Sequence, residues 1–484
     1  NFWYLQGLER LGIPSILVAD GPHGLRRQRG DGDHVGLHDS DPATCFPTAA
    51  ALAASWNRDL LFSVGQALAE ECRDAGVSVL LGPGANIKRS PLCGRNFEYF
   101  SEDPYLSGQL AASNIRGLQS RGVGASLKHY CANNQEYRRM TIDVVVDERA
   151  LREIYLAGFE IAVTESQPWT VMCAYNRVNG TYASEHAELM TAILKEEWGH
   201  EGLVITDWGA TSNRIAGLEA GVEVEMPGTF SGNDADIAAA VRSGRIAEAV
   251  LDKAAARILE LIAKAAPAPA QSGETFDAVA HHALARRAAE EGTVLLKNDG
   301  ALLPLTGKRC VALLGRFARE PRYLGAGSSL VNPSRLDTLF GALCERLGEN
   351  CVSYSPGYDE VGEGVDDAAI ASALECCDGA DTVVICAGLT DRYEIEGLDR
   401  THLDLPPGHV ALIEAVAAVH QRVVVLLSNG SPVLMPWLDQ VAAVVECYLG
   451  GQAAAGAVAD ILCGAVNPSG KLAETFPLQL EDTP

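Results

Sequence analysis

The sequence lacks long hydrophobic runs and has few basic residues, and both absences limit the class of protein. No apolar stretch in the 484 residues approaches the ~20 needed to cross a bilayer, so we expect no membrane span. The 38 Lys and Arg residues are outnumbered by 63 Asp and Glu, which gives a formal net charge of −25. This charge opposes nucleic acid phosphates and favours a small neutral or cationic molecule as the partner.

Signatures of disulfides and metal sites are missing as well. The thirteen cysteines form an odd set without a Cys-x-x-Cys pair, which favours reduced thiols and a cytoplasmic location. No signal peptide is visible, and because the chain begins at Asn1 we expect its natural start upstream. The histidines, including His281 and His282, show no metal-ligand spacing. We predict no metal and no cofactor; homo-oligomerisation is left open.

The first half of the chain alternates apolar strand-like segments with helical stretches. The expected strands are 15–19, 77–81, 124–127, 170–173 and 203–206, and the expected helices include 58–75, 107–121, 148–165, 185–198 and 211–220. Six or so such units in about 230 residues predict a (β/α)8-type, TIM-like barrel over residues 1–264. In that fold the reacting groups gather at the carboxyl ends of the strands.

A second α/β domain is expected over residues 276–484, after an Ala- and Pro-rich linker at 265–275. The expected helices are 276–297, 335–347 and 409–420, and the expected strands are 310–314, 381–389, 422–427 and 442–447. This pattern predicts an α/β sandwich, a sheet covered by helices on both faces. The glycines at 315, 325 and 327 are interpreted as turn residues, since no GxGxxG enters a helix.

Polar residues follow several of the expected strands. Asp20, in Ala-Asp-Gly-Pro-His-Gly, can point into a cavity, or it can merely close an Asx-turn. Lys128 and His129 supply donors for a hydroxyl-rich ligand, or they form a solvated edge. Asp207 follows strand 203–206 and is either a reacting carboxylate or a helix N-cap.

Two loops add further charged candidates. Arg95 and Glu98 lie in a polar and aromatic loop that suits sugar binding, or Arg95 forms a salt bridge with Glu98 or Glu102 that only holds the loop. The loop 388–400 carries Glu394 and Glu396 and is by default a charged surface loop. A retaining glycosidase, however, needs a second carboxylate about 5.5 Å from its nucleophile, and a neighbouring domain can supply one.

Together these segments resemble glycoside hydrolase family 3, the β-glucosidase-like enzymes. The resemblance covers almost the whole chain and depends on motifs that occur in the family's order. They are Ala-Asp20-Gly-Pro-His-Gly-Leu-Arg, the stretch 82–98 with Gly-Arg95-Asn-Phe-Glu, Lys128-His129-Tyr, Met172 to Gly180, Val-Ile-Thr-Asp207-Trp-Gly-Ala, Glu396-Gly-Leu-Asp-Arg, and Asn467-Pro-Ser-Gly-Lys-Leu472.

The resemblance implies a retaining, exo-acting β-glycosidase, which we expect to be a β-glucosidase acting on a small β-glucoside or oligosaccharide. It implies that Asp207 is the nucleophile and that Glu396, from the second domain, is the acid/base. Glu394 is the rival acid/base because the loop offers two glutamates. The residues implied to line the sugar pocket are Asp20, Arg95, Lys128, His129, Met172, Tyr175 and Trp208.

Other members of the family provide alternatives. Those acting on N-acetylglucosamine carry Lys-His-Phe-Pro-Gly-His where this chain has Lys128-His-Tyr-Cys-Ala-Asn, which disfavours that substrate. Xylosidase-like members tend to have Glu at the position of Asp20. A phosphorylase and a degenerate sugar-binding protein also stay open. Many relatives continue into a fibronectin type III-like domain, which we do not expect within these residues.

Overall fold

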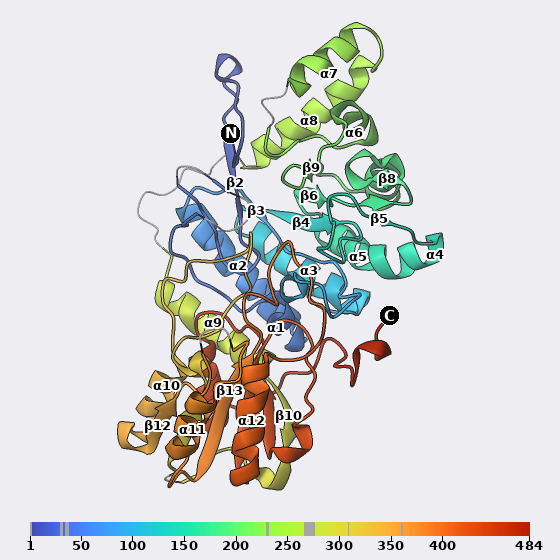
Figure 1. Cartoon of the computed structure of the whole chain (residues 1–484). Coiled ribbons are helices and arrows are strands. Elements are labelled where there is room, and N and C mark those ends of the chain that lie inside the picture. The colour runs from blue at the N-terminus through green and yellow to red at the C-terminus, as the bar shows by residue number, and fades with distance from the viewer. Residues whose placement is uncertain are drawn as a thin grey trace.

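The structure is a computed structural model that describes residues 2–29, 32–33, 38–228, 232–265, 276–307, 309–359 and 362–484. Residues 266–275 of the predicted linker lie outside this part. Figure 1 shows two α/β parts, one above the other, with helix α9 (Ala278–Gly292) between them. We refer to residues 2–265 as the N-terminal part and to residues 276–484 as the C-terminal part.

The N-terminal part is built on a six-stranded sheet whose spatial order follows the chain. Its strands are β1 (Tyr4–Leu5), β2 (Ile16–Asp20), β3 (Val79–Leu81), β4 (Gly124–Tyr130), β6 (Thr170–Cys173) and β9 (Leu203–Thr206). The last five are parallel, whereas β1 is antiparallel to β2. The described ladder thus has five parallel strands, fewer than the eight of a full (β/α)8 barrel, and beyond β9 a single bridge joins Ile205 to Val224.

Side chains on one face of this sheet form a core that joins its first and last strands. Val18, Met172 and Ile205 belong to the same buried cluster as Trp3 and Trp208. The Trp3 and Trp208 rings are 5.0 Å apart, and Trp208 Nε1 donates to the Phe2 carbonyl at 3.2 Å. The sheet is therefore curled, since the side chains beside its two edge strands touch.

Helices cover the opposite face of the sheet. The covering helices are α2 (Arg58–Asp74), α3 (Pro104–Gln119) and α5 (Ala157–Ser166). Asn57 caps α2 by accepting from the Asp59 and Leu60 N–H groups, and Asp103 caps α3 just before Pro104. Further helices are α1 (Ala49–Ala54), α4 (Glu148–Ala150), α6 (Arg214–Ala220), α7 (Asn233–Arg242) and α8 (Glu248–Ala265), with π-helical segments at Leu151–Leu156 and Glu188–Glu197. A small sheet contains β5 (Asp143–Val144), β7 (Arg177–Val178) and β8 (Thr181–Tyr182).

The C-terminal part contains a second six-stranded sheet. Its order is β10 (Val294–Asn298), β15 (Ala443–Glu446), β14 (Val423–Ser428), β13 (Thr382–Gly388), β11 (Val311–Leu314) and β12 (Val352–Ser355). All neighbours are parallel except β10 and β15. The helix predicted over 276–297 was wrong at its end, because Val294–Asn298 pair with β15 as a strand.

Both faces of the second sheet are buried under helices. Val311 and Leu313 pack with α10 (Leu339–Leu347) and α13 (Ala454–Leu462), whereas Ala312 and Leu314 pack with α11 (Asp367–Cys376) and α12 (Pro407–Val419). A strand buried on both faces reads as a continuous apolar run, because its side chains alternate between two cores.

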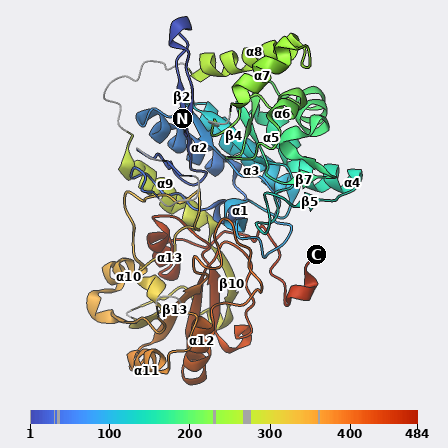
Figure 2. The same ribbon diagram turned by 45° about the horizontal axis from the view of Figure 1, so that its top comes forward.

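The two parts are packed tightly against each other. Ala285 and Ala288 of α9 belong to the core beneath the first sheet. The last segment of the chain returns to the N-terminal part (Figure 2), where Glu474 accepts a 2.7 Å hydrogen bond from the buried Lys88. Within the described residues, no helix has the length and apolar character to span a membrane.

Candidate active site

Asp207 lies at the carboxyl end of β9 in a buried position. Its Oδ1 accepts a 2.7 Å hydrogen bond from the Trp208 N–H, and its Oδ2 lies 3.6 Å from His129 Nε2. Burial raises the pKa of Asp207, although the Arg95 and Arg139 guanidinium groups act in the opposite direction. Asp207 is not the cap of the following helix, since the Asn213 side chain caps α6.

His129 is held in one orientation by its neighbours. Its backbone N–H donates to Asn86 Oδ1 at 2.8 Å, and its Nδ1 lies 3.2 Å from the Tyr99 hydroxyl. Burial, followed by the nearby Arg95, lowers the pKa of His129 well below its usual value. The imidazole is therefore neutral at physiological pH, so its contact with Asp207 is not an ion pair.

Asp20, at the end of β2, and Lys128, in β4, form a buried ion pair across the intervening strand β3. Lys128 Nζ donates to Asp20 Oδ1 at 2.9 Å, and the same oxygen accepts from the Gly21 N–H at 2.9 Å. The side chains of Asp20 and Lys128 are 8% and 2% exposed, so neither belongs to a solvated edge. The other oxygen of Asp20, Oδ2, can accept hydrogen bonds from sugar hydroxyls.

Arg95 makes the predicted contact with Glu98 and a further one with the C-terminal part. Its Nε and Nη2 donate to the two Glu98 oxygens at 2.9 and 2.8 Å. Its Nη1 lies 3.6 Å from Glu396 Oε1. The salt-bridge alternative is thus present, and the same guanidinium also faces the acid/base candidate.

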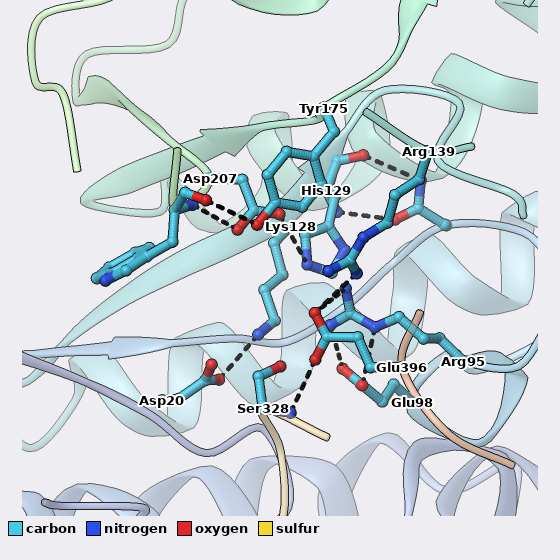
Figure 3. Close-up of polar contacts among 12 residues, drawn as sticks. Asp20, Arg95, Glu98, Lys128, His129, Arg139, Tyr175, Asp207, Ser328 and Glu396 are labelled. Atoms are coloured by element: carbon cyan, nitrogen blue, oxygen red, sulfur yellow. Dashed lines mark hydrogen bonds and ion pairs between the residues drawn. The ribbon is translucent and has the colours of Figure 1, made fainter. Parts of the chain in front are cut away.

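Glu396 comes from the C-terminal part and enters the N-terminal cluster. Its Oε1 accepts from Arg139 Nη1 at 2.7 Å, and its Oε2 accepts from the Ser328 N–H at 2.8 Å. Burial alone would raise the pKa of Glu396, but Arg95, Arg139 and Ser328 together hold it well below its ordinary value. Figure 3 shows this carboxylate beside Arg95 and Arg139, in the same cluster as Asp207.

Glu394 points elsewhere. Its Oε1 accepts from the Gly430 N–H at 2.5 Å and from Ser431 Oγ at 3.3 Å, and its Oε2 lies 3.9 Å from Arg322. Burial raises the pKa of Glu394. These partners all belong to the C-terminal part, so the two glutamates of the loop have different surroundings.

Tyr175, Trp208 and Met172 lie near Asp207. The Tyr175 hydroxyl donates to the Trp208 carbonyl at 3.1 Å, and the Arg139 guanidinium lies 4.8 Å from the centre of the Tyr175 ring. Trp208 and Met172 belong to the inner core of the curled sheet. The structure therefore places Met172 in a packing position, in the same core as the indole of Trp208.

Sequence reasoning did not single out two residues that contact Glu396, Arg139 and Ser328. Arg139 lies ten positions after His129, and the adjacent pair Arg138-Arg139 in a loop after a strand was an available signal. Ser328 follows Gly327, which was interpreted as a turn residue. Gly327 has φ +121°, and a Cβ there would lie 2.5 Å from Glu396 Cβ. Glycine is needed because the loop that carries Glu396 approaches this backbone closely.

The fold and the site define a two-part α/β protein whose buried carboxylates come from both parts. Residues 5–261 match the glycosyl hydrolase family 3 N-terminal domain, and residues 293–484 match the family 3 C-terminal domain. The chain belongs to glycosyl hydrolase family 3, which confirms the resemblance seen in the sequence.

Individual relatives match over the whole chain. Thermostable beta-glucosidase B of Acetivibrio thermocellus is 54% identical over 485 residues, and an exo-alpha-(1->6)-L-arabinopyranosidase of Bifidobacterium breve is 46% identical over 493. The match covers 100% of this chain in both cases, but only 64% and 65% of those relatives. The chain thus spans a little less than two thirds of their length.

Solved structures agree with this assignment. The crystal structure of a family 3 β-glucosidase of Bifidobacterium adolescentis has a TM-score of 0.94 and 45% identity, and the match covers 100% of this chain and 69% of that one. Beta-glucosidase 3B of Thermotoga neapolitana, solved in complex with α-D-glucose, has a TM-score of 0.89 and 36% identity, over 99% and 71% of the two chains.

Proposed function

We propose that this chain carries the active site of a retaining, exo-acting β-glycosidase, a β-glucosidase that hydrolyses terminal non-reducing β-D-glucosyl residues. The observation that carries the proposal is the entry of Glu396 from the C-terminal part into the buried cluster around Asp207. Two carboxylates facing one sugar position are the requirement of glycoside hydrolysis. The 54% identity to a thermostable β-glucosidase supports the choice of glucosides.

In the first step, an Asp207 oxygen attacks the anomeric carbon while the bond to the aglycone oxygen breaks. The carboxylic proton of Glu396 passes to that leaving oxygen, and a covalent glycosyl-enzyme remains. In the second step, Glu396 takes a proton from water, the resulting hydroxide oxygen bonds to the anomeric carbon, and Asp207 leaves as a carboxylate. Two carboxylates suffice for this chemistry, so we infer that no cofactor is needed.

Glu396 needs a proton for the first step, whereas Arg95 and Arg139 hold it ionised in the free site. We infer that a bound sugar draws Arg139 away from Glu396, because Arg139 lies between this carboxylate and the Tyr175 ring. Losing that cation raises the pKa of Glu396 toward the range that a general acid requires. Asp207 stays ionised because Arg95 and Lys128 still lower its pKa.

The sugar is bound by polar groups around Asp207. Asp20 and Arg95 offer charged partners to hydroxyls, His129 and Tyr175 flank the nucleophile, and Trp208 supplies an apolar wall. Lys128 holds Asp20 in place, and Met172 supports Trp208 from the core. We infer exo action, the release of terminal residues, from membership of glycosyl hydrolase family 3.

The architecture that goes with this function is a barrel-type domain, residues 1–264, a linker at 265–275 and an α/β sandwich domain, residues 276–484. The contact of Trp3 with Trp208 and the helices on both faces of the second sheet support this division. We infer a cytoplasm-like compartment from the thirteen free thiols. Small glucosides, rather than nucleic acids, are the proposed partners.

A second candidate function is suggested by the relative named as an exo-alpha-(1->6)-L-arabinopyranosidase, at 46% identity. An α-L-arabinopyranoside has the ring of a β-D-galactoside without the hydroxymethyl group. It therefore differs from a β-D-glucoside in the orientation of the C4 hydroxyl and in the missing hydroxymethyl group, and the groups that face these two positions decide between the two substrates. The xylosidase and phosphorylase alternatives from the sequence are tested in the same way, the first by its preferred sugar and the second by its need for phosphate.

One set of rates tests these functions. The kcat/KM is measured for p-nitrophenyl β-D-glucoside, β-D-xyloside, β-D-galactoside, α-L-arabinopyranoside and N-acetyl-β-D-glucosaminide, each with and without phosphate. The β-glucoside should be the best substrate, with no dependence on phosphate and with retention of configuration in the first product. A faster arabinopyranoside would replace the proposed substrate, and phosphate-dependent formation of a sugar phosphate would identify a phosphorylase.

A further inference from the structure

The Asp399 carboxylate attaches the loop that carries Glu396 to the N-terminal part. Its Oδ1 accepts from the Gly94 N–H at 3.1 Å and from the Glu136 N–H at 2.9 Å. Its Oδ2 accepts from the Tyr137 N–H at 2.8 Å and from the Glu136 N–H at 3.0 Å. One side chain of the C-terminal part thus satisfies three backbone donors on two loops of the N-terminal part.

Neighbouring contacts strengthen the same attachment. The Gly397 N–H donates to Glu136 Oε2 at 2.7 Å, and the Arg400 N–H donates to the Leu92 carbonyl at 2.8 Å. A Cβ on Gly94 would lie 1.8 Å from the Leu398 carbonyl oxygen, so the acid/base loop rests directly on this glycine. The residues that directly follow Glu396 are therefore held by the other part of the chain.

We propose that Asp399 is a positioning residue that holds Glu396 in its working place against Asp207. The inference rests on the proposed glycosidase function. It adds the contact by which the C-terminal part holds its acid/base in the site. Only a carboxylate meets the demand at this site, because both of its oxygens accept and three N–H groups converge on it. An amide would turn a donor toward a donor, although its size is nearly the same.

The kinetic prediction follows from the separate tasks of Asp207 and Glu396. A shift of about 1 Å in a catalytic group costs on the order of 100-fold in rate. In Asp399→Asn, poor leaving groups such as alkyl glucosides should therefore react about 100-fold more slowly. Formation of the glycosyl-enzyme from 2,4-dinitrophenyl β-glucoside should change by less than about 10-fold, because that leaving group departs without a proton.

Azide separates misplacement of Glu396 from general damage. Azide attacks the glycosyl-enzyme without help from a base, so it should speed up turnover of the dinitrophenyl glucoside by Asp399→Asn and give β-glucosyl azide. Gly94→Ala disturbs the same loop from the opposite side and should give the same pattern. Asp404→Asn is the matched control, since this exposed aspartate of the same segment pairs only with His402 among the described contacts.

Backbone amide exchange tests the attachment without any activity. In Asp399→Asn and Gly94→Ala, the amides of Glu136 and Tyr137 should exchange about 10-fold faster or more, because a charge-assisted acceptor is lost or displaced. They should be unchanged in Asp404→Asn. If the wild-type chain hydrolyses no glycoside, the proposed function fails while the exchange data still decide whether Asp399 makes the attachment.

Two results would overturn the inference. One is unchanged exchange at Glu136 and Tyr137 in both loop variants, which would mean that Asp399 does not hold the loop. The other is faster exchange with equal losses on all substrates and no azide effect, which would reduce Asp399 to a structural residue. Should Asp399→Asn fail to fold, Gly94→Ala decides by the same two measurements.

Discussion

Arg139 Nη1 donates a 2.7 Å hydrogen bond to Glu396 Oε1 across the boundary between the two parts of the chain. The same nitrogen lies 2.9 Å from Glu136 Oε2, and the guanidinium covers the Tyr175 ring. This relationship sets the charge state of the proposed acid/base, because Arg139 is among the cations that lower the pKa of Glu396.

Replacing Arg139 should shift the pH dependence of catalysis. Arg139 lowers the pKa values of both Glu396 and Asp207, so Arg139→Ala raises both. Both limbs of the kcat/KM profile report ionisations of the free enzyme, so both should move to higher pH. We expect kcat/KM at neutral pH to fall about 10- to 100-fold, which corresponds to the loss of one charge-assisted hydrogen bond.

The control for this variant is Arg138→Ala, since Arg138 is its exposed neighbour. Its pH profile should match that of the wild type. A pH profile whose two limbs both stay in place in Arg139→Ala would show that Arg139 does not control the ionisation of Glu396 and Asp207.

Asp207→Asn should abolish turnover while making the fold more stable at neutral pH. We expect kcat to fall on the order of 10⁴-fold or more, as when a covalent nucleophile is removed. Burial raises the pKa of Asp207 in the folded protein above the ordinary value of an aspartate. The ionised carboxylate therefore costs stability above the folded pKa, and this cost disappears below the unfolded one.

Thermal unfolding of Asp207→Asn and wild type at pH 7 and at pH 3 tests the stability difference. The variant should have the higher Tm at pH 7, and the difference should vanish at pH 3. Asp252→Asn, at an exposed position on α8, should change neither activity nor Tm. Near wild-type hydrolysis by folded Asp207→Asn would remove Asp207 from the nucleophile position.

The two glutamates of the acid/base loop should respond differently to substitution. Glu396→Ala should slow the cleavage of alkyl or saccharide glucosides by about 10²- to 10⁴-fold, the range of general acid catalysis. It should affect the first step on an activated aryl glucoside far less, and azide should restore its second step. Glu394→Ala should lower activity on all substrates alike, without azide rescue, because Glu394 binds Gly430 and Ser431 within its own part.

Analysis of the products formed in azide decides which of the two glutamates is the acid/base. Glucosyl azide formed by Glu394→Ala and not by Glu396→Ala would exchange the two roles. Thermal unfolding of Glu394→Ala should also show a loss of stability, since the Gly430 N–H would lose a buried acceptor.

Lengthening Asp20 should change the preferred sugar. The Asp20 carboxylate is fixed by Lys128 and Gly21, so an added methylene in Asp20→Glu fills space toward the sugar. We expect the ratio of kcat/KM for β-glucoside over β-xyloside to fall about 10-fold or more, on the scale of one methylene in a pocket. An unchanged ratio would mean that Asp20 does not discriminate the hydroxymethyl group, and Asp20→Asn controls for the loss of the charge.

Much of the site was predictable from the sequence because it lies at the ends of parallel strands. Asp20, Lys128 and Asp207 each follow or end an apolar segment that is recognisable by its composition. Parallel strands place their carboxyl ends at one edge, so a local pattern carries information about proximity. The strand Val294–Asn298 was missed for the opposite reason, since only its pairing with β15 distinguishes it from the end of helix α9.

The sequence by itself determined the alternation of strands and helices, the two α/β parts and the polar residues at the strand ends. Only the tertiary structure decided which residues of distant loops meet. Arg139 and Glu396 are 257 positions apart, and Glu136 and Asp399 are 263 apart. Their contacts depend on how the two α/β parts pack together. Neither periodicity nor spacing along the chain encodes that packing, because it depends on the shapes of two surfaces.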